Sequence, residues 1–292
     1  GCESHGRKFD WKNDTAPEIS KEDLIMYKLH VRGFTMDSNV NGAGTFQGIR
    51  NKLNYLESLG INAIELMPVY EFEEMLVPPK PKETEFTKIT WEPEEEDLIK
   101  PEIEPEEKIK INFWGYGRGN YFAVKSSYAK EPLKASYEFK KLVRTLHERN
   151  IECIMEIYFE DDTNHNLIRD VLRYWVREYH VDGFRFDLMG IHDIETMKEI
   201  RKALDEIDPS IIIYGEGWTG GDSTLDETKR AVKKNISLVE GVAAFSDDIR
   251  DGIKGNVFDA LDQGFVNGGE GMENAIRYSV LGATQNDQVD YD

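Results

Sequence analysis

Short apolar runs alternate along this chain with longer stretches in which apolar residues recur every three or four positions. The runs are rich in β-branched and aromatic side chains and are bounded by turn residues, which predicts buried strands. They occupy residues 61–69, 152–159, 181–187 and 211–218. The helical spacing predicts helices over residues 44–59, 139–146, 167–176 and 194–207. This order predicts a parallel sheet whose strands are joined by right-handed crossovers.

Two further strands and one helix are expected outside this central part. Residues 26–34 alternate like a first strand, and residues 241–248 read as a sixth. A polar helix rich in Lys and Glu is expected after Trp218, and the remainder after Asp248, which includes Gly264, Gly268, Gly269 and Gly271, is expected to be loop-rich. Cys153 lies in a predicted strand and is expected to be a small core residue.

Two segments interrupt the pattern. Residues 1–22 are polar and are expected to be a linker from an upstream domain, which leaves residues 23–292 as one barrel domain. Residues 73–110 hold six of the chain's ten prolines together with acidic runs, and this composition predicts a solvated insertion after the second strand. A lid over the substrate is the alternative interpretation of this insertion.

Charge and cysteine content narrow the class of partner. A net charge of −20 and a pI of about 4.8 argue against nucleic acid or an anionic membrane surface, whereas a neutral glycan is compatible with them. The two cysteines do not suggest a disulfide, and the six scattered histidines do not suggest a metal site. We therefore expect no cofactor. A structural calcium ion is an open alternative, because the chain has many acidic side chains that could bind it. No signal peptide or membrane span is visible, and the compartment, cytoplasmic or secreted, stays open.

Two of the predicted strands end in a carboxylate, Asp187 and Glu216. In a barrel of alternating strands and helices the carboxyl ends of the strands carry the chemistry. Neighbouring strands lie about 4.8 Å apart, which suits the roughly 5–5.5 Å between the two carboxyl groups of a retaining glycosidase. We therefore expect these two acids to be partners on one rim.

The motifs around both acids resemble those of a known family. Asp-Gly-Phe-Arg-Phe-Asp-Leu-Met-Gly at 182–190, followed by Tyr-Gly-Glu-Gly-Trp at 214–218, is similar to the second and third signatures of glycoside hydrolase family 13, the α-amylase family. The residues of these two motifs are most similar to those of its type I pullulanase and isoamylase-like debranching branch. The resemblance implies that Asp187 is the nucleophile, Arg185 its charge partner and Glu216 the general acid/base.

The resemblance also implies substrate-binding residues. Trp114-Gly115-Tyr116 is similar to the stretch whose Tyr stacks on the sugar that is cleaved, so Tyr116 takes that role and Trp114 and Trp218 flank the site. Glu156 stands where the first signature has an Asp, and it is expected to contact the substrate. Phe113 and Phe122, in the same aromatic segment as Tyr116, are expected to fill the core instead.

The family pattern fails at two signatures. The first signature's Asn-His pair has no clear counterpart, and the nearest imidazole, His165, is expected in the first turn of a helix rather than on the substrate. The His-Asp pair of the fourth signature does not occur before residue 292. We therefore expect a (β/α)8 TIM-barrel-type fold that is truncated after about six strands.

The expected activity is retaining hydrolysis of α-glucosidic bonds in pullulan, glycogen or starch. The preference for α-1,6 branch bonds rests on the resemblance alone. Arg185 is expected to keep Asp187 ionised, and partial desolvation is expected to raise the pKa of Glu216. Three alternatives stay open: a silent α-glucan-binding barrel, a non-autonomous fragment of a larger enzyme, and a purely structural Arg185–Asp187 ion pair.

Overall fold

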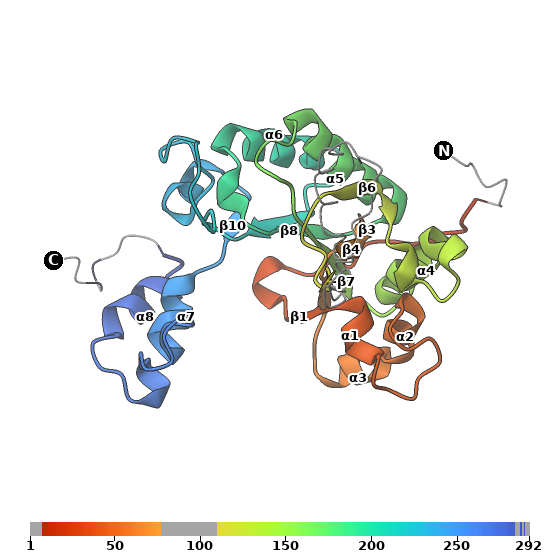
Figure 1. Cartoon of the computed structure of the whole chain (residues 1–292), viewed down its shortest axis with the longest axis horizontal. Coiled ribbons are helices and arrows are strands. Elements are labelled where there is room, and N and C mark those ends of the chain that lie inside the picture. The colour runs from red at the N-terminus through yellow and green to blue at the C-terminus, as the bar shows by residue number, and fades with distance from the viewer. Residues whose placement is uncertain (1–7, 77–109, 284–286, 288, 290–292) are drawn as a thin grey trace, which may run out of the picture.

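A parallel sheet of six strands forms the centre of the computed structural model, which describes residues 8–76, 110–283, 287 and 289 (Figure 1). Every neighbouring pair of strands in this sheet runs parallel. In the order of the sheet the strands are β1 (Met26–Leu29), β2 (Ala63–Leu66), β7 (Glu152–Ile157), β8 (Gly183–Phe186), β9 (Ile212–Gly215) and β10 (Ala243–Ala244). Each of the four apolar runs therefore contains one strand, as predicted.

The sheet curves around an interior. Tyr214 on β9 donates a hydrogen bond to Glu65 on β2, although β7 and β8 lie between these two strands. A small apolar cluster of Ala63, Ile154 and Tyr214 fills the same inner space. A flat sheet would keep β2 and β9 about 14 Å apart, because neighbouring strands are about 4.8 Å apart. The six strands thus form part of a (β/α)8 barrel.

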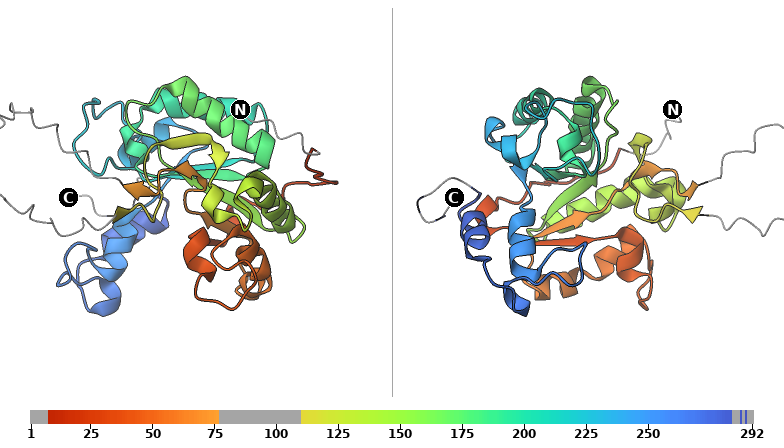
Figure 2. Two further views of the ribbon diagram at one scale, coloured as in Figure 1. Left: turned by 45° about the vertical axis from the view of Figure 1, so that its right-hand side comes forward. Right: turned by 60° about the vertical axis from the view of Figure 1, so that its left-hand side comes forward.

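Three long helices cover the outer face of the sheet: α4 (Ala135–His147), α5 (His165–Tyr179) and α6 (Ile194–Asp205) (Figures 1 and 2). Their buried side chains recur at helical spacing and pack in the main core. Trp175 of α5 is the largest fully buried side chain; its ring meets Phe139 edge-on, and its indole N–H donates to Tyr121 O at 2.7 Å. None of the described helices is both long and apolar enough to cross a membrane.

Local capping explains where several elements begin. The Asn164 side chain accepts a hydrogen bond from Asn166 N ahead of α5, and the Asp193 side chain accepts one from Thr196 N ahead of α6. His30 caps α1 (Val31–Thr35) in the same way, because its Nδ1 accepts a hydrogen bond from Gly33 N. This cap starts the helix directly after β1. The strand expected over 26–34 is therefore wrong beyond Leu29.

The helix expected over residues 44–59 is divided in two. It consists of α2 (Phe46–Asn51) and α3 (Leu53–Ser58), which are separated at Lys52. Gly60, in a left-handed conformation with φ of 75°, ends the second of them as predicted. The apolar face is continuous despite the break, since Ile49, Leu53 and Leu56 are all buried.

Two small antiparallel sheets follow β2, and they were not predicted. One pairs β3 (Tyr70–Phe72) with β6 (Gly119–Val124), and the other pairs β4 (Met75–Leu76) with β5 (Lys110–Ile111). Most of the insertion predicted over 73–110 lies outside the described residues. The core positions predicted for Phe113 and Phe122 are wrong, because their side chains are 37% and 41% exposed. Phe113 stacks on His30, and Phe122 packs edge-on against Tyr174 at the surface.

The C-terminal third departs furthest from expectation. No helix forms over residues 219–232; a single 3-10 helix follows at Lys233–Leu238. The sixth strand has only two residues, and the chain then forms α7 (Asp247–Lys254) and α8 (Glu273–Val280) instead of loops. These two helices pack on each other and project from the β10 end of the sheet (Figure 1). Ser246 caps α7 by accepting a hydrogen bond from Ile249 N.

The linker expected over residues 1–22 stays a prediction, but its described part is in contact with the barrel. A 3-10 helix at Lys21–Asp23 is its only regular element among residues 8–23. Trp11 stacks on His180 with 3.7 Å between ring centroids, and the Asp14 side chain is buried. Cys153 is fully buried in β7, as expected.

Candidate active site

Five consecutive strands each contribute one polar side chain to the interior of the curved sheet. Their order along the sheet is Lys28 on β1, Glu65 on β2, Glu156 on β7, Arg185 on β8 and Tyr214 on β9. Lys28 Nζ lies 3.0 Å from Glu156 Oε2 and 3.6 Å from Glu65 Oε1. Glu156 is also paired with Arg185. The inner face at this level is therefore an array of charges, although the strands themselves are largely apolar.

Asp187 and Glu216 each follow directly after the last residue of their strand, β8 and β9. Glu216 N donates to Phe186 O at 3.0 Å, which continues the ladder between these strands as far as the two acids. The Arg185 guanidinium joins the carboxylates: Nη1 lies 2.8 Å from Asp187 Oδ1, and Nη2 lies 2.7 Å from Glu216 Oε1. The structure thus brings together the three residues that the sequence predicted as partners on one rim.

The backbone after Asp187 turns back toward Glu216. Leu188 adopts a left-handed conformation, with φ of 47°, which is uncommon for a residue other than glycine. Its N–H donates to Glu216 Oε2 at 3.0 Å. Both carboxylate oxygens of Glu216 therefore accept a hydrogen bond, one from Arg185 and one from the backbone N–H of Leu188.

Asp187 lies in a less favourable electrostatic environment. Burial and the neighbouring Glu216 carboxylate raise the pKa of Asp187 to about 6, against the opposing effect of Arg185. Arg185 acts in the expected direction, since it favours the ionised form of Asp187, but burial and Glu216 outweigh it. Asp187 is nevertheless mostly ionised at pH 7.

Tyr116 and Glu156 lie beneath the two acids. The Tyr116 hydroxyl donates to Glu156 Oε1 at 2.7 Å, and Glu156 also binds Arg185. The Glu156 side chain is 0% exposed, so it acts on the rim through Arg185 and Tyr116. Burial and the Glu156 carboxylate raise the pKa of Tyr116 far above its usual value, which keeps the phenol neutral and donating.

A cleft of about 450 Å³ opens beside Glu216 and Arg185. Trp218 lines this cleft, as do Lys28, Met26, Phe245 and Arg250, residues that sequence reasoning did not select. Phe245 lies 5.4 Å from the Arg185 guanidinium, in a cation–π arrangement.

Two other residues named in the sequence analysis, Trp114 and His165, contact groups other than the two acids. Trp114 is 55% exposed and meets the rings of Phe113 and His30 edge-on. His165 is the first residue of α5, as expected, and its Nε2 lies 3.5 Å from Asp193 Oδ2.

Glu65 and Lys28, which sequence reasoning did not select, are only weakly marked as site residues in the sequence. Glu65 stands between apolar residues in a predicted buried strand, which is unusual for an unpaired acid. Lys28 occurs at an alternate position of the first strand, where a solvated side chain is equally common. Spacing along the sequence does not reveal that these two side chains meet, because three helices separate β1 from β2.

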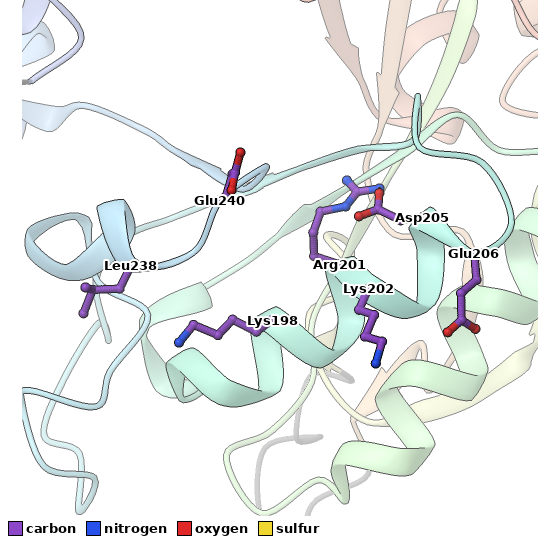
Figure 3. Close-up of a pocket in the computed structure, with 7 residues that line it drawn as sticks. All are labelled: Lys198, Arg201, Lys202, Asp205, Glu206, Leu238 and Glu240. Atoms are coloured by element: carbon purple, nitrogen blue, oxygen red, sulfur yellow. The ribbon is translucent and has the colours of Figure 1, made fainter.

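A larger pocket, of about 580 Å³, lies on the outside of the barrel and is drawn in Figure 3. Its walls are α6 and the segment that includes Leu238 and Glu240. Arg201, which is buried, donates to Ile211 O at 2.5 Å and pairs with Asp205 at 2.6 Å. In the described part of the chain no three His, Cys, Asp or Glu side chains are arranged to hold a metal ion.

Comparison with known proteins agrees with this geometry. The family described as alpha amylase, catalytic domain, matches residues 30–166. Pullulanase A of Streptococcus pneumoniae is 28% identical over 325 residues, which cover 93% of this chain and 24% of that protein. Isoamylase 1, chloroplastic, of Oryza sativa subsp. japonica is 32% identical over 282 residues, which cover 79% of this chain and 30% of that protein.

Solved structures give the same result. Pullulanase from Paenibacillus barengoltzii, in complex with maltohexaose and α-cyclodextrin, has a TM-score of 0.76 and 26% sequence identity, over 97% of this chain and 49% of that chain. Pullulanase from Anoxybacillus sp. LM18-11, complexed with maltotetraose, has a TM-score of 0.73 and 27% identity, over 93% of this chain and 44% of that one. The chain thus spans less than half the length of these relatives. Together these matches support a debranching-type member of the α-amylase family, glycoside hydrolase family 13, similar to the pullulanases and isoamylases.

Proposed function

We propose that this chain carries the nucleophile and the general acid/base of a retaining α-glucan hydrolase that cleaves α-1,6 branch bonds. The observation that carries the proposal is the Arg185 bridge between Asp187 and Glu216, at the carboxyl ends of adjoining parallel strands. The choice of α-1,6 bonds is supported by the relatives, which are pullulanases and isoamylases. The residues predicted as one barrel, 23–292, would form the catalytic domain, with the insertion at 73–110.

In this mechanism the two acids act in turn. The ionised Asp187 attacks the anomeric carbon while Glu216 donates a proton to the glycosidic oxygen, which leaves with the bonding electrons. Glu216, now a carboxylate, removes a proton from water; the resulting oxygen attacks the same carbon and releases Asp187. Tyr116 would stack on the sugar that is cleaved, with Trp114 and Trp218 beside it. Arg185 would hold both carboxylates in place through the two steps.

The proposal is tested by reducing-sugar release from pullulan and from amylose. Glu216→Gln keeps the size of the side chain but cannot donate a proton, so we expect turnover to fall roughly 10²–10⁴-fold. Glu227→Gln, on an exposed loop, is the matched control and should keep wild-type turnover. A loss of less than tenfold in Glu216→Gln would contradict the assignment of the acid/base.

A second candidate function is α-glucan binding without cleavage. It is supported by one observation: the aromatic side chains of Trp218 and Phe245 line the cleft beside Glu216, and such side chains can bind sugar rings without help from the two acids. Titration calorimetry with maltohexaose, combined with product analysis of the same samples, separates the two functions. Binding without any released product, from a chain shown to be folded by circular dichroism, would favour the silent binding protein.

A further inference from the structure

Arg185 is shared between three carboxylates, and this is the starting point of the inference. Its Nη1 contacts both Glu156 and Asp187, and its Nη2 contacts Glu216. One positive charge therefore faces three negative ones. If Glu156 had no other cation, it would compete with Asp187 and Glu216 for the guanidinium, because opposite charges in a low-dielectric interior attract strongly.

Lys28 is the second cation at Glu156. Glu156 Oε1 accepts from Tyr116 and Arg185, whereas Oε2 makes no hydrogen bond within the described part of the chain. Lys28 Nζ lies 3.0 Å from this second oxygen. Each oxygen of the buried carboxylate therefore faces its own cation, one from β8 and one from β1.

Lys28 also limits the charge of the interior as a whole. Glu65 Oε1, which likewise lacks a hydrogen bond among the described residues, lies 3.6 Å from Lys28 Nζ. Four acids face this space, Glu65, Glu156, Asp187 and Glu216, and the cations that contact them are Lys28 and Arg185. Removing Lys28 would leave Arg185 to balance the three acids that it contacts and would leave Glu65 without its ion pair to Lys28.

We propose that Lys28 is a positioning residue for the reaction: it occupies the far oxygen of Glu156 and so leaves the Arg185 guanidinium on Asp187 and Glu216. The role assigned to these two acids rests on the function proposed above. The contacts that define the role of Lys28 exist independently of turnover. Lys28 would act on the nucleophile through Glu156 and Arg185 and would not touch the reacting atoms.

The ionisation of Asp187 reports this role directly. The negative charge of Glu156 acts on Asp187 in the same direction as burial and Glu216, toward a higher pKa, whereas Arg185 acts against them. When Lys28 is lost, Tyr116 and Arg185 remain on Glu156, which then draws the guanidinium toward itself. The pKa of Asp187 should then rise.

The experiment is a carboxyl ¹³C NMR titration of Asp187 in wild type, Lys28→Met, Glu156→Gln and the double variant, with Asp187→Asn to assign the signal. We expect Lys28→Met to raise the titration midpoint by about 1 pH unit and Lys28→Arg to restore it. In the Glu156→Gln background, Lys28→Met should change the midpoint by less than about a third of that shift. An unchanged or lowered midpoint in Lys28→Met, in a chain that melts cooperatively, would overturn the proposal.

The double variant also separates positioning from direct contact with the glucan. Lys28 is 42% exposed and lines the cleft, so an ammonium–sugar contact is the competing role. That role predicts that Lys28→Met weakens maltohexaose binding equally in both backgrounds and leaves the Asp187 midpoint unchanged. Because the titration needs no turnover, a wild-type chain that releases no sugar would contradict the proposed function while leaving this test intact.

Discussion

At the scale of single residues, Asp187 differs from an ordinary surface acid in what surrounds it. Burial and the Glu216 carboxylate raise its pKa to about 6, and Arg185 opposes them. Replacing Glu216 by Gln removes one like charge, so we expect the pKa of Asp187 to fall toward the usual value for Asp, near 4. A carboxyl ¹³C NMR titration measures both midpoints.

The matched control for this prediction is Asp193→Asn, which removes a carboxylate that caps α6 and has no contact with Arg185. It should leave the Asp187 midpoint where it is. A wild-type midpoint near 4, or a rise in Glu216→Gln, would show that like-charge repulsion does not control this site. If turnover occurs, its loss on acidification should follow the wild-type midpoint, because a protonated Asp187 cannot attack.

Tyr116 combines an aromatic face with a hydrogen bond to the buried Glu156, and two substitutions separate these properties. Tyr116→Phe keeps the ring and loses a bond to a charged acceptor, which costs about 2 kcal/mol of unfolding free energy. We expect it to retain maltohexaose affinity while its melting temperature falls. Tyr116→Ala removes the ring as well, so both its maltohexaose affinity and its melting temperature should fall. Calorimetry and thermal melts check this, and equal affinity losses in both variants would refute a stacking role.

Sequence reasoning predicted the position of residues that stand at the end of a strand. Arg185, Asp187 and Glu216 stand in short runs, and the backbone ladder between β8 and β9 brings them to one rim. It failed where a side chain's environment depends on distant segments. Phe113 stacks on His30, which follows β1 and lies more than 80 residues earlier in the sequence. The contact between Lys28 and Glu156 could not be predicted for the same reason, since the two residues lie on different strands.

At the scale of elements, a buried cluster joins the N-terminal segment to α4 and α5. His147, the last residue of α4, lies 3.0 Å from Asp14 through Nδ1 and 3.0 Å from Asp182 through Nε2. His180, just after α5, contacts the other oxygen of Asp14 at 2.6 Å. An imidazole with a carboxylate at each nitrogen donates from both, so His147 is positively charged here.

This cluster predicts how stability depends on pH. Burial opposes the charged imidazole, but the hydrogen bonds to Asp14 and Asp182 outweigh it and raise the pKa of His147 to about 9. The native state thus holds a proton that the unfolded chain releases near pH 6.5. The resulting stabilisation is complete below pH 6.5 and is lost as the pH rises through 9. We expect the unfolding free energy to fall by about 2–3 kcal/mol between pH 7 and 9.

Urea unfolding at several pH values measures this slope. His147→Gln should be less stable at pH 7 and should lose most of the slope. The buried thiol of Cys153, whose pKa is raised by burial, adds to the slope above about pH 8.5 and is present in both chains. His165→Gln, a change at a half-exposed position on the opposite rim, should keep the wild-type slope. A flat wild-type profile from pH 7 to 9 would contradict the charged state of His147.

Element boundaries were predictable where periodicity and caps agree, as for α5, which begins after Asn164. The boundaries were not predictable where a single local contact determines where a strand ends and a helix begins. His30 turns the first strand into a helix through its bond to Gly33 N, and the alternation of the following residues gives no sign of it. The helix expected after Trp218 did not form. There the backbone instead pairs with neighbouring segments, such as Ile194 N with Lys229 O and Ala231 N with His192 O.

At the scale of the whole molecule, the described sheet has two edge strands, β1 and β10. An edge strand exposes unpaired backbone groups that can pair with another chain. The net charge of −20 opposes such contact by repulsion, which salt screens. We therefore expect this chain to self-associate as its concentration increases, and more strongly at 0.5 M than at 0.05 M NaCl. Sedimentation velocity across both series measures the association.

Two methionine substitutions test the origin of this association. Met26 is an exposed residue of β1, and Met26→Lys places a charge on the edge, so association should decrease. Met36→Lys adds the same charge at an exposed position just after α1 and should change association little. Equal effects of both variants would point to net charge alone, and a monomer under all conditions would refute pairing through the edge.

The attachment of the N-terminal segment has a practical consequence for handling the molecule. Asp182 precedes β8 and Asp187 follows it, so the anchoring cluster and Asp187 are roughly 16 Å apart at about 3.3 Å per residue. Trp11 and Asp10 hold the incoming chain at the anchoring end, against His180 and Arg144. A resin, dye or sensor surface coupled upstream of Trp11 should therefore leave the rim with its acids facing the solution, open to a long polymeric glucan.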